Sequence, residues 1–336
     1  MVFVTGATGL IGSYLLMELA KKGESIRALK RKNSSLKAVQ NLFDSHSLSQ
    51  EFQQIEWVEA DLESIPKLIE CLQGIETIYH TAAHVGFDDR FRRDIHKVNS
   101  EGTENLVNLA ISEQVSNFVY VSSISVLDNS PNEKMITENS KWDPEKPHSE
   151  YAISKKKGEM NVWRGSQEGL NVLVVYPSVV IGSLDGQRAS ERIFKLAYHK
   201  NAFATEGKTG YVDVRDVARI MVELVEAKKW NQGYILNSGE RSFVDIFNYL
   251  RTKKNLKPIQ AVSLSKLKLV KFLSLFSKFF GGPFMSKASF QALTGNSTYS
   301  TEKIQSIIQR PFISIEEALN DHSEQYLRII NQKNSD

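Results

Sequence analysis

A glycine-rich turn near the amino terminus constrains this chain more than any other feature. Thr5–Gly12 reads TGATGLIG and stands between a strand-like run, Val2–Thr5, and a helical pattern over Leu10–Lys22. Glycines at this point allow a tight turn, a close approach of backbone to a phosphate, and close packing of helix on strand. The free N–H groups and positive dipole end of the helix then favour an anion. The turn therefore predicts a dinucleotide pyrophosphate site.

The first half of the chain alternates short β-rich runs with amphipathic helical stretches, which indicates a parallel sheet covered on both faces. The expected strands are Val2–Thr5, Ser25–Leu29, Ile55–Glu59, Thr77–His80, Phe118–Val121 and Val172–Tyr176. The expected helices between them are Leu10–Lys22, Ile65–Leu72, Ile95–Ser112 and Tyr151–Glu168. We predict an α/β fold whose residues 1–176 form mainly a doubly wound, Rossmann-type domain.

After Tyr176 the pattern loosens, and loops rich in Gly, Ser and Asn separate helical stretches. Further helices are expected at Glu191–His199, Val214–Lys229 and Phe243–Lys254, and from Ser263 to about Ile330. Residues 177–336 are predicted to form mainly a smaller substrate-binding lobe, with crossover segments that return to the first domain.

Composition and charge exclude several classes of protein. Forty-two Lys and Arg face 39 Asp and Glu, and a net charge of +3 is too small to indicate nucleic acid as a partner. The single cysteine, Cys71, excludes an intrachain disulfide and fits a reducing cytoplasm, so we expect a cytoplasmic protein. The most apolar stretch, Leu264–Phe280, contains lysines and is expected to pack on the lobe without membrane insertion. No spacing typical of a metal site occurs, so no metal is expected.

Basic residues follow the second strand, where NAD-preferring folds place a carboxylate for the ribose 2′-hydroxyl. Lys30 and Arg31 occupy this place. Arg31 can pair with a 2′-phosphate and stack on adenine, which favours NADP, with NAD as the alternative and a solvated basic loop as the other interpretation. Asp61, after the third strand, either accepts from the adenine amino group or caps the helix near Ser64.

A tyrosine and a lysine share one face of a predicted helix. Tyr151 and Lys155 lie one turn apart in YAISK. A tyrosine acts as acid or base near neutral pH only if its pKa falls from about 10, and a nearby ammonium favours the phenolate. Ser122 and Ser123 end the fifth strand at the carboxyl edge, where a hydroxyl can hold a substrate oxygen. The pattern predicts proton transfer by Tyr151.

Over roughly residues 2–240 the chain resembles an extended short-chain dehydrogenase/reductase. The matching segments are TGATGLIG at 5–12, ADL at 60–62, HTAA at 80–83, VNSEGT at 98–103, VSS at 121–123, YAISK at 151–155, YPSVVIG at 176–182 and VRDVA at 214–218. This resemblance implies a catalytic triad of Ser123, Tyr151 and Lys155, with Asn99 supporting the proton relay. It also implies a fold that is often dimeric.

By the same resemblance, the cofactor would contact the glycine turn, the ends of several strands and the triad. The residues concerned are Gly6, Thr8, Gly9, Leu10, Ile11, Gly12, Arg31, Asp61, Leu62, Thr81, Ala82, Ala83, Tyr151, Lys155, Tyr176, Pro177, Ser178 and Val179. His80, which ends the fourth strand, is predicted to be a packed core histidine.

Departures from the family pattern limit the class of reaction that is expected. Dehydratases place Thr-Asp-Glu after the fifth strand, whereas this chain has Ser123–Val126 without a carboxylate. Sugar-nucleotide epimerases commonly carry an arginine before the V-x-D-V-A segment, whereas only Lys208 is present here. Both departures disfavour a sugar nucleotide.

Apolar segments surround the expected substrate region. They include Val85, Gly86 and Phe87 and the carboxyl-terminal residues Phe272, Leu275, Phe276, Phe279, Phe280 and Phe284. They resemble the dihydroflavonol-reductase-like and 3β-hydroxysteroid-dehydrogenase-like branches. We predict an NADP(H)-dependent oxidoreductase that interconverts a carbonyl and a secondary alcohol on a fairly hydrophobic small molecule. A nucleotide-sugar epimerase is the alternative, and the intact triad disfavours a non-catalytic dinucleotide sensor.

Overall fold

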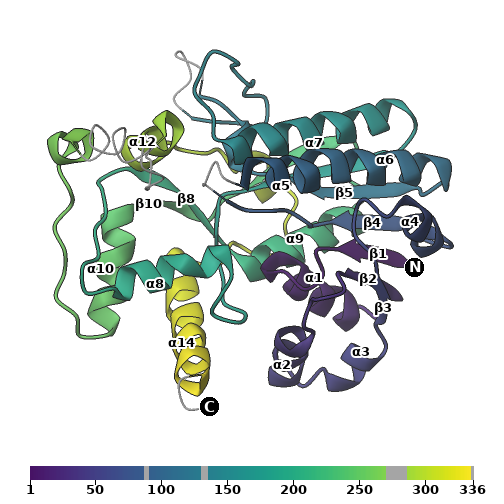
Figure 1. Ribbon diagram of the computed structural model, residues 1–336, viewed down its shortest axis with the longest axis horizontal. Helices are drawn as coiled ribbons and strands as arrows, with labels where there is room; N and C mark the ends of the chain where they lie inside the picture. The colour runs from purple at the N-terminus through teal and green to yellow at the C-terminus, as the bar shows by residue number, and fades with distance from the viewer. Residues whose placement is uncertain (87–90, 130–134, 270–285, 334–336) are drawn as a thin grey trace.

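A seven-stranded parallel sheet forms the centre of the computed structural model, which describes residues 1–86, 91–129, 135–269 and 286–333 (Figure 1). Its strand order is β3-β2-β1-β4-β5-β6-β9. The strands are β1 Val2–Thr5, β2 Ile26–Lys30, β3 Glu56–Glu59, β4 Thr77–His80, β5 Asn117–Val121, β6 Asn171–Pro177 and β9 Gln232–Leu236. This order confirms the predicted doubly wound fold, because the chain reverses direction across the sheet between β1 and β4.

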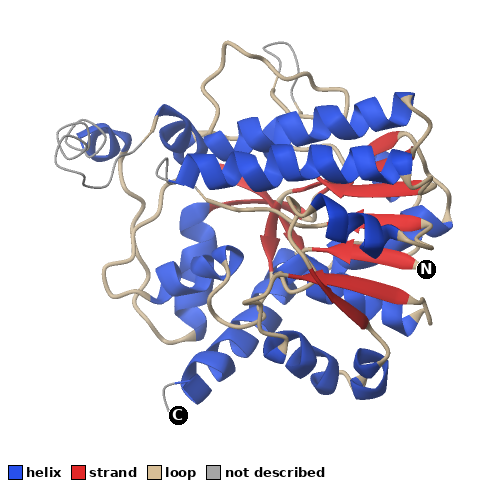
Figure 2. Ribbon diagram, turned by 45° about the vertical axis from the view of Figure 1, so that its right-hand side comes forward, coloured by secondary structure: helices blue, strands red, loops and turns tan. Residues whose placement is uncertain are grey.

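Helices cover both faces of this sheet (Figure 2). They are α1 Leu10–Lys21, α2 Lys37–Ser45, α3 Ser49–Gln53, α4 Ile65–Leu72, α5 Arg92–His96, α6 Gly102–Ser112, α7 Glu150–Gln167, α8 Arg192–Tyr198, α9 Val214–Glu226, α10 Phe243–Lys253, α12 Lys287–Thr294, α13 Glu302–Gln305 and α14 Ile315–Lys333. Short 3₁₀ turns lie at Ile124–Val126 and Ala189–Glu191. The stretch predicted as one helix over Ile95–Ser112 is interrupted by a π-helical turn, Lys97–Glu101, between α5 and α6.

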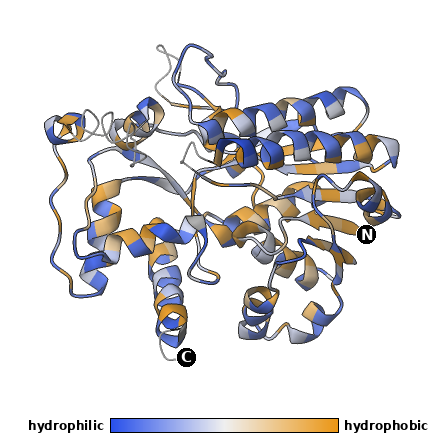
Figure 3. Cartoon of the chain, viewed as in Figure 1, coloured by the Kyte–Doolittle hydropathy of each residue, from blue (hydrophilic) through white to orange (hydrophobic). Residues whose placement is uncertain are grey.

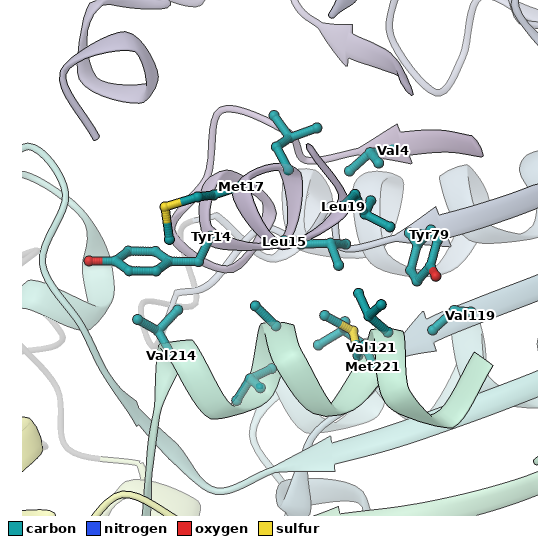
Figure 4. Close-up of a cluster of buried hydrophobic side chains, with 14 of the residues drawn as sticks. Val4, Tyr14, Leu15, Met17, Leu19, Tyr79, Val119, Val121, Val214 and Met221 are labelled. Carbon is teal, nitrogen blue, oxygen red and sulfur yellow. The ribbon is translucent and has the colours of Figure 1, made fainter. Parts of the chain in front are cut away.

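Apolar side chains fill the space between the sheet and each helix layer. On one face, α1 and α9 pack together over the strands, and Figure 4 shows Leu15 and Leu19 of α1 near Met221 of α9. On the other face, α4, α6 and α7 bury a second cluster against the same strands. Figure 3 shows hydrophobic colour along the strands and mixed colour on α6 and α7, as expected for helices with one buried face.

A second, three-stranded sheet follows directly from two strands of the first. It has the order β10-β8-β7, built from β7 Val179–Ile181, β8 Lys208–Asp213 and β10 Gly239–Ser242. β6 runs almost directly into β7, and β9 almost directly into β10. The Ser178 N–H donates to the Leu236 carbonyl at 3.0 Å and ties these two crossings together. The lobe built on this sheet therefore stands at the carboxyl ends of β6 and β9, and its core also uses α8, α10 and α14.

Several of the apolar residues predicted near the substrate lie outside the described residues. These are Phe87, Phe272, Leu275, Phe276, Phe279, Phe280 and Phe284. Of the stretch Leu264–Phe280, the described part has Leu267 buried and Leu264 and Leu269 exposed. Within the described ranges, no helix combines the length and apolar character needed to cross a bilayer.

The close approach of α7 to its neighbours predicts a difference between two glycines on that helix. A Cβ at Gly158 would lie 2.3 Å from the Asn99 carbonyl oxygen, whereas a Cβ at Gly165 would meet only movable side-chain carbons of Val107 and Leu170. We expect Gly158→Ala to lower the free energy of unfolding by about 1–3 kcal/mol through overpacking. Gly165→Ala should cost less, because the side chains that its Cβ meets can shift, whereas the Asn99 carbonyl cannot. Both substitutions gain about 1 kcal/mol of helix propensity. Urea unfolding of both variants checks this, and a Gly158→Ala variant as stable as wild type would contradict it.

Candidate active site

The glycine turn packs directly on the loop after β4. Gly6 has a φ of +67°, and a Cβ there would lie 2.6 Å from the Ala82 nitrogen. A Cβ at Gly12 would lie 2.2 Å from the Gly6 carbonyl oxygen. Both neighbours are backbone atoms that side-chain rotation cannot move, so this turn requires glycine at both places.

The amino terminus of α1 offers a cradle for an anion. Gly9 occupies the N-cap position with extended backbone, and within the described residues no side chain caps this helix. Thr8, Gly9 and Ile11 are partly exposed at the turn, while the Leu10 side chain is buried against Gly182. Uncapped first-turn N–H groups beside a glycine backbone suit a pyrophosphate, so the residues present fit the predicted dinucleotide.

At the end of β2, one basic side chain is ion-paired within the described residues and the next one is not. Lys30 pairs with Glu59 at 2.9 Å. Arg31 is exposed, and its guanidinium makes no hydrogen bond or ion pair with the described residues. Asp61 accepts from the Glu63 N–H at 2.9 Å and from the Ser64 hydroxyl at 3.1 Å, which is a side-chain turn ahead of α4. The N-cap of α4 is Ser64, and within the described residues no side chain caps this helix, so the capping alternative for Asp61 is wrong and the adenine contact stays a prediction.

The other predicted cofactor residues line strand ends. Leu62 is buried and packs against Gly102 at the start of α6. Thr81 donates to the Thr5 carbonyl oxygen at 2.8 Å, with Ala82 partly exposed and Ala83 exposed beside it. Pro177 ends β6, Ser178 is buried and Val179 is exposed. The buried Tyr176 directs its hydroxyl to Glu159 on α7 at 3.4 Å, so a cofactor contact at this position would involve its backbone.

Ser123 and Tyr151 meet in one hydrogen-bonded site. The Ser123 oxygen accepts from the Ser125 N–H at 3.2 Å and from the Ser125 hydroxyl at 3.0 Å. Since two donors occupy its oxygen, the Ser123 hydrogen is left to donate to the Tyr151 oxygen or to a substrate oxygen. A hydrogen bond from Ser123 favours the phenolate, but burial outweighs it and raises the pKa of Tyr151 to about 12.

Lys155 is buried and contacts the strand end instead of the phenol. Its Nζ donates to the Val121 carbonyl oxygen at 2.6 Å and lies 4.1 Å from the centroid of the Tyr120 ring. Burial lowers the pKa of Lys155 to about 7, against the opposing attraction of Glu159. The sequence predicted that Lys155 lowers the pKa of Tyr151, and the structure differs because burial disfavours the charged forms of both groups.

Asn99 connects the loop after β4 to α7. It is fully buried in the π-helical turn, which is a type of irregularity often found at functional sites. Its Nδ2 donates to the His84 carbonyl and to the Ser154 hydroxyl, each at 3.0 Å, and its Oδ1 accepts from the His84 N–H at 2.7 Å. Asn99 thereby positions α7 and the loop after β4, while its part in a proton relay stays a prediction.

His80 connects the glycine turn to Asn99. Thr5 Oγ1 lies 2.6 Å from His80 Nδ1, and His80 Nε2 lies 2.9 Å from Thr103 Oγ1. Because Thr103 donates its hydrogen to the Asn99 carbonyl at 2.8 Å, Nε2 must carry the imidazole hydrogen and Nδ1 must accept from Thr5. Burial lowers the pKa of His80 to about 3, and the prediction of a core histidine is confirmed.

Two residues of this site were missed by sequence reasoning. Ser125 has no distinctive sequence signal, because only the turn at Ile124–Val126 brings its hydroxyl back to Ser123. Glu159 did have a signal, since it follows Lys155 by four residues and therefore shares its helix face.

The neutral His80 predicts acid sensitivity of the fold. The unfolded chain binds a proton near the usual pKa of 6.5 and the folded protein only near 3, so stability falls as the pH drops below 6.5. In His80→Gln this contribution is absent. The gap in unfolding free energy between wild type and variant should therefore narrow by about 1.4 kcal/mol between pH 7.5 and 5.5. Urea titrations at both pH values test this, with the exposed His46→Gln as control, and a constant gap for His80→Gln would contradict it.

Comparisons with known proteins agree with this architecture. The sequence model of the NAD dependent epimerase/dehydratase family matches residues 2–239. Sterol demethylase protein B of Methylococcus capsulatus is 30% identical over 68% of this chain and 66% of its own length. A putative dihydroflavonol 4-reductase of Synechocystis is 29% identical over 64% of this chain and 60% of its own length. The matches thus span less than two thirds of either relative.

Solved structures share the fold over nearly the whole chain. The crystal structure of gox2253 superposes with a TM-score of 0.82 at 23% identity and covers 98% of both chains. The yeast methylglyoxal/isovaleraldehyde reductase Gre2, complexed with NADPH, has a TM-score of 0.75 at 20% identity and covers 98% of this chain and 99% of its own. At these identities the likeness concerns the fold alone.

Proposed function

Because the chain belongs to the NAD dependent epimerase/dehydratase family, as its resemblance predicted, we propose that it is an oxidoreductase that interconverts a carbonyl and a secondary alcohol. The observation that carries this proposal is the hydrogen-bonded pair of Ser123 and Tyr151, set beside Lys155 at the carboxyl end of β5. In a doubly wound sheet the strand ends near the topological switch point hold the dinucleotide, so these groups face the place where chemistry occurs.

Different residues of the site are proposed to bind the cofactor and to transfer the proton. The glycine turn and the uncapped first turn of α1 would hold the pyrophosphate, and the Lys155 ammonium would contact the nicotinamide ribose. When bound, the nicotinamide supplies or accepts the hydride. Ser123 donates a hydrogen bond to the substrate oxygen, and Tyr151 gives that oxygen a proton during reduction or takes one during oxidation.

Tyr151 carries its proton at neutral pH. With its pKa raised to about 12, Tyr151 is protonated at neutral pH and ready to donate to a developing alkoxide. Oxidation of an alcohol needs the phenolate, which burial disfavours. The protonated phenol is the form that begins carbonyl reduction, and the phenolate is the form that begins alcohol oxidation.

Exposed apolar residues after β4 support a hydrophobic substrate. Val85 and Phe91 are exposed large apolar residues, and the rings of Phe91 and His84 lie 6.0 Å apart. His84 itself is held by Asn99, which in turn contacts the catalytic helix. The relative named as a dihydroflavonol 4-reductase supports a reductase that acts on an apolar carbonyl compound.

Tyr151→Phe separates chemistry from cofactor binding. The substitution removes the hydroxyl that transfers the proton and keeps the partly exposed ring. We expect kcat to fall by at least about 10²-fold, the usual contribution of a general acid, with NADPH affinity unchanged. The rate of NADPH oxidation with a panel of hydrophobic ketones gives kcat. Nicotinamide fluorescence gives the affinity for NADPH. Wild-type turnover in the variant would overturn the mechanism, whereas epimerisation of a nucleotide sugar without net NADPH consumption would favour the alternative function.

Arg31 is proposed to select NADP. Its guanidinium is exposed and unpaired among the described residues, and a bidentate pair with a 2′-phosphate needs such a group. We expect Arg31→Ala to weaken NADPH binding at least about tenfold, or about 1.4 kcal/mol, and to leave NADH binding unchanged. The control is Lys30→Ala, because Lys30 is already paired with Glu59. Fluorescence titrations measure the affinity of each variant for NADPH and for NADH. An equal loss of affinity for both cofactors in Arg31→Ala would contradict the assignment.

A further inference from the structure

Glu159 is a buried carboxylate directly behind the catalytic groups. It lies one turn after Lys155 and two turns after Tyr151, so the three side chains occupy one face of α7. Its side chain is 2% exposed. A carboxylate so deeply buried needs compensating partners, because its transfer from water is costly.

Three donors converge on its two oxygens. Ser122 donates its hydroxyl to Oε2 at 2.7 Å, and Tyr176 donates to Oε1 at 3.4 Å. The Nζ of Lys156, which is 25% exposed, pairs with Oε1 at 3.1 Å. This set suits a carboxylate anion, which accepts and does not donate.

The same carboxylate completes a series of contacts between β5 and α7. Three consecutive residues at the strand end each bind one residue of the helix face. The pairs are Val121 with Lys155, Ser122 with Glu159, and Ser123 with Tyr151. The strand end that presents the catalytic serine is therefore held on both sides, and Glu159 makes the middle contact.

The titratable groups near Lys155 lie on several elements, and most of them are neutral. Tyr120 of β5 and His80 of β4 face it as neutral groups, since burial raises the pKa of Tyr120 and lowers that of His80. Tyr176 of β6, whose pKa burial also raises, contacts Glu159. Tyr151, on its own helix, is protonated for the same reason. Lys156 adds a second positive charge nearby. Glu159 is the group whose charge opposes the loss of the Lys155 proton.

We propose that Glu159 is a positioning residue for this reaction: its buried carboxylate, on the same face of α7, is the counter-charge that favours the ammonium form of Lys155, and its bond to Ser122 holds the strand end that carries Ser123. The proposal rests on the proposed function, because Lys155 matters as an ammonium that grips the nicotinamide ribose and favours proton transfer from Tyr151. It adds a fourth side chain to the triad without giving that side chain contact with the reacting atoms.

The decisive variant is Glu159→Gln, which keeps size and a hydrogen-bond acceptor but removes the charge. The pKa of Lys155 is measured by ¹³C NMR of protein labelled at lysine Cε, with the resonance assigned by its loss in Lys155→Met. We expect this pKa to fall by at least about one unit in Glu159→Gln. We also expect the alkaline limb of the kcat/KM profile for NADPH-dependent reduction to move to lower pH by the same amount. An unchanged pKa of Lys155 in folded Glu159→Gln would overturn the proposal.

Matched variants separate charge from hydrogen bonding and from general damage to the helix. Ser122→Ala removes the main donor and keeps the carboxylate, so the pKa of Lys155 should stay within about 0.3 unit; a fall as large as in Glu159→Gln would refute the counter-charge. Lys156→Gln, at the surface, removes a like charge, so the pKa of Lys155 should rise, and a fall would contradict the proposal. Glu168→Gln, near the exposed end of α7 and paired with Arg164 there, should change nothing.

Turnover and the NMR titration of Lys155 test the proposed function and the role of Glu159 separately. If wild-type protein reduces no carbonyl substrate with NADPH, the proposed function fails while the NMR titration still decides whether Glu159 holds the charge on Lys155. If turnover is present and the Lys155 resonance ignores Glu159, the function stands and this inference falls.

Discussion

The close approach of α7 to the end of β5 buries Lys155 and Glu159 and covers part of Tyr151, and much of the site follows from that burial. Gly158 permits the approach, because any side chain there would meet the Asn99 carbonyl oxygen and the Tyr120 hydroxyl. Lys155 and Glu159 then lie buried beside the partly exposed Tyr151, and each buried charge must be balanced locally. In this setting Tyr151 keeps its proton and Lys155 is close to losing one, so the balance of charge depends on the neighbouring carboxylate.

A second line of contacts joins the cofactor turn to the same helix. The Ala82 N–H donates to Thr5, Thr5 to His80, His80 to Thr103, and Thr103 to the Asn99 carbonyl. Each hydroxyl donates once and accepts once, so the order of donors is consistent only with a neutral His80 that carries its hydrogen on Nε2. The side chain of Asn99 continues the connection to Ser154 of α7. The glycine turn and the catalytic helix are thereby positioned through one buried network, which rigidifies the site when every member is satisfied.

The sequence predicts the first half of the fold well because buried parallel strands are continuous apolar runs. Val2–Thr5 and Thr77–His80 are found at the predicted residues, and the other predicted strands differ by one residue at either end. The small sheet escaped prediction because β8 and β10 carry exposed polar residues such as Lys208 and Arg241, and their partners lie far away in sequence. The π-helical turn escaped as well, since its extra residue has no signal in helical periodicity.

Spacing along a helix identifies neighbours but says nothing about the solvent around them. The four-residue interval between Tyr151 and Lys155 predicts that the ammonium assists the phenol, and in water that attraction would be the main effect. In the folded protein, desolvation acts on both groups and is larger than the interaction between them. A lysine whose pKa is about 7 responds strongly to any charge nearby, because its two forms are close in free energy. The sensitivity of this site therefore arises from burial, and the residues that control it are the ones that bring or withhold charge around Lys155.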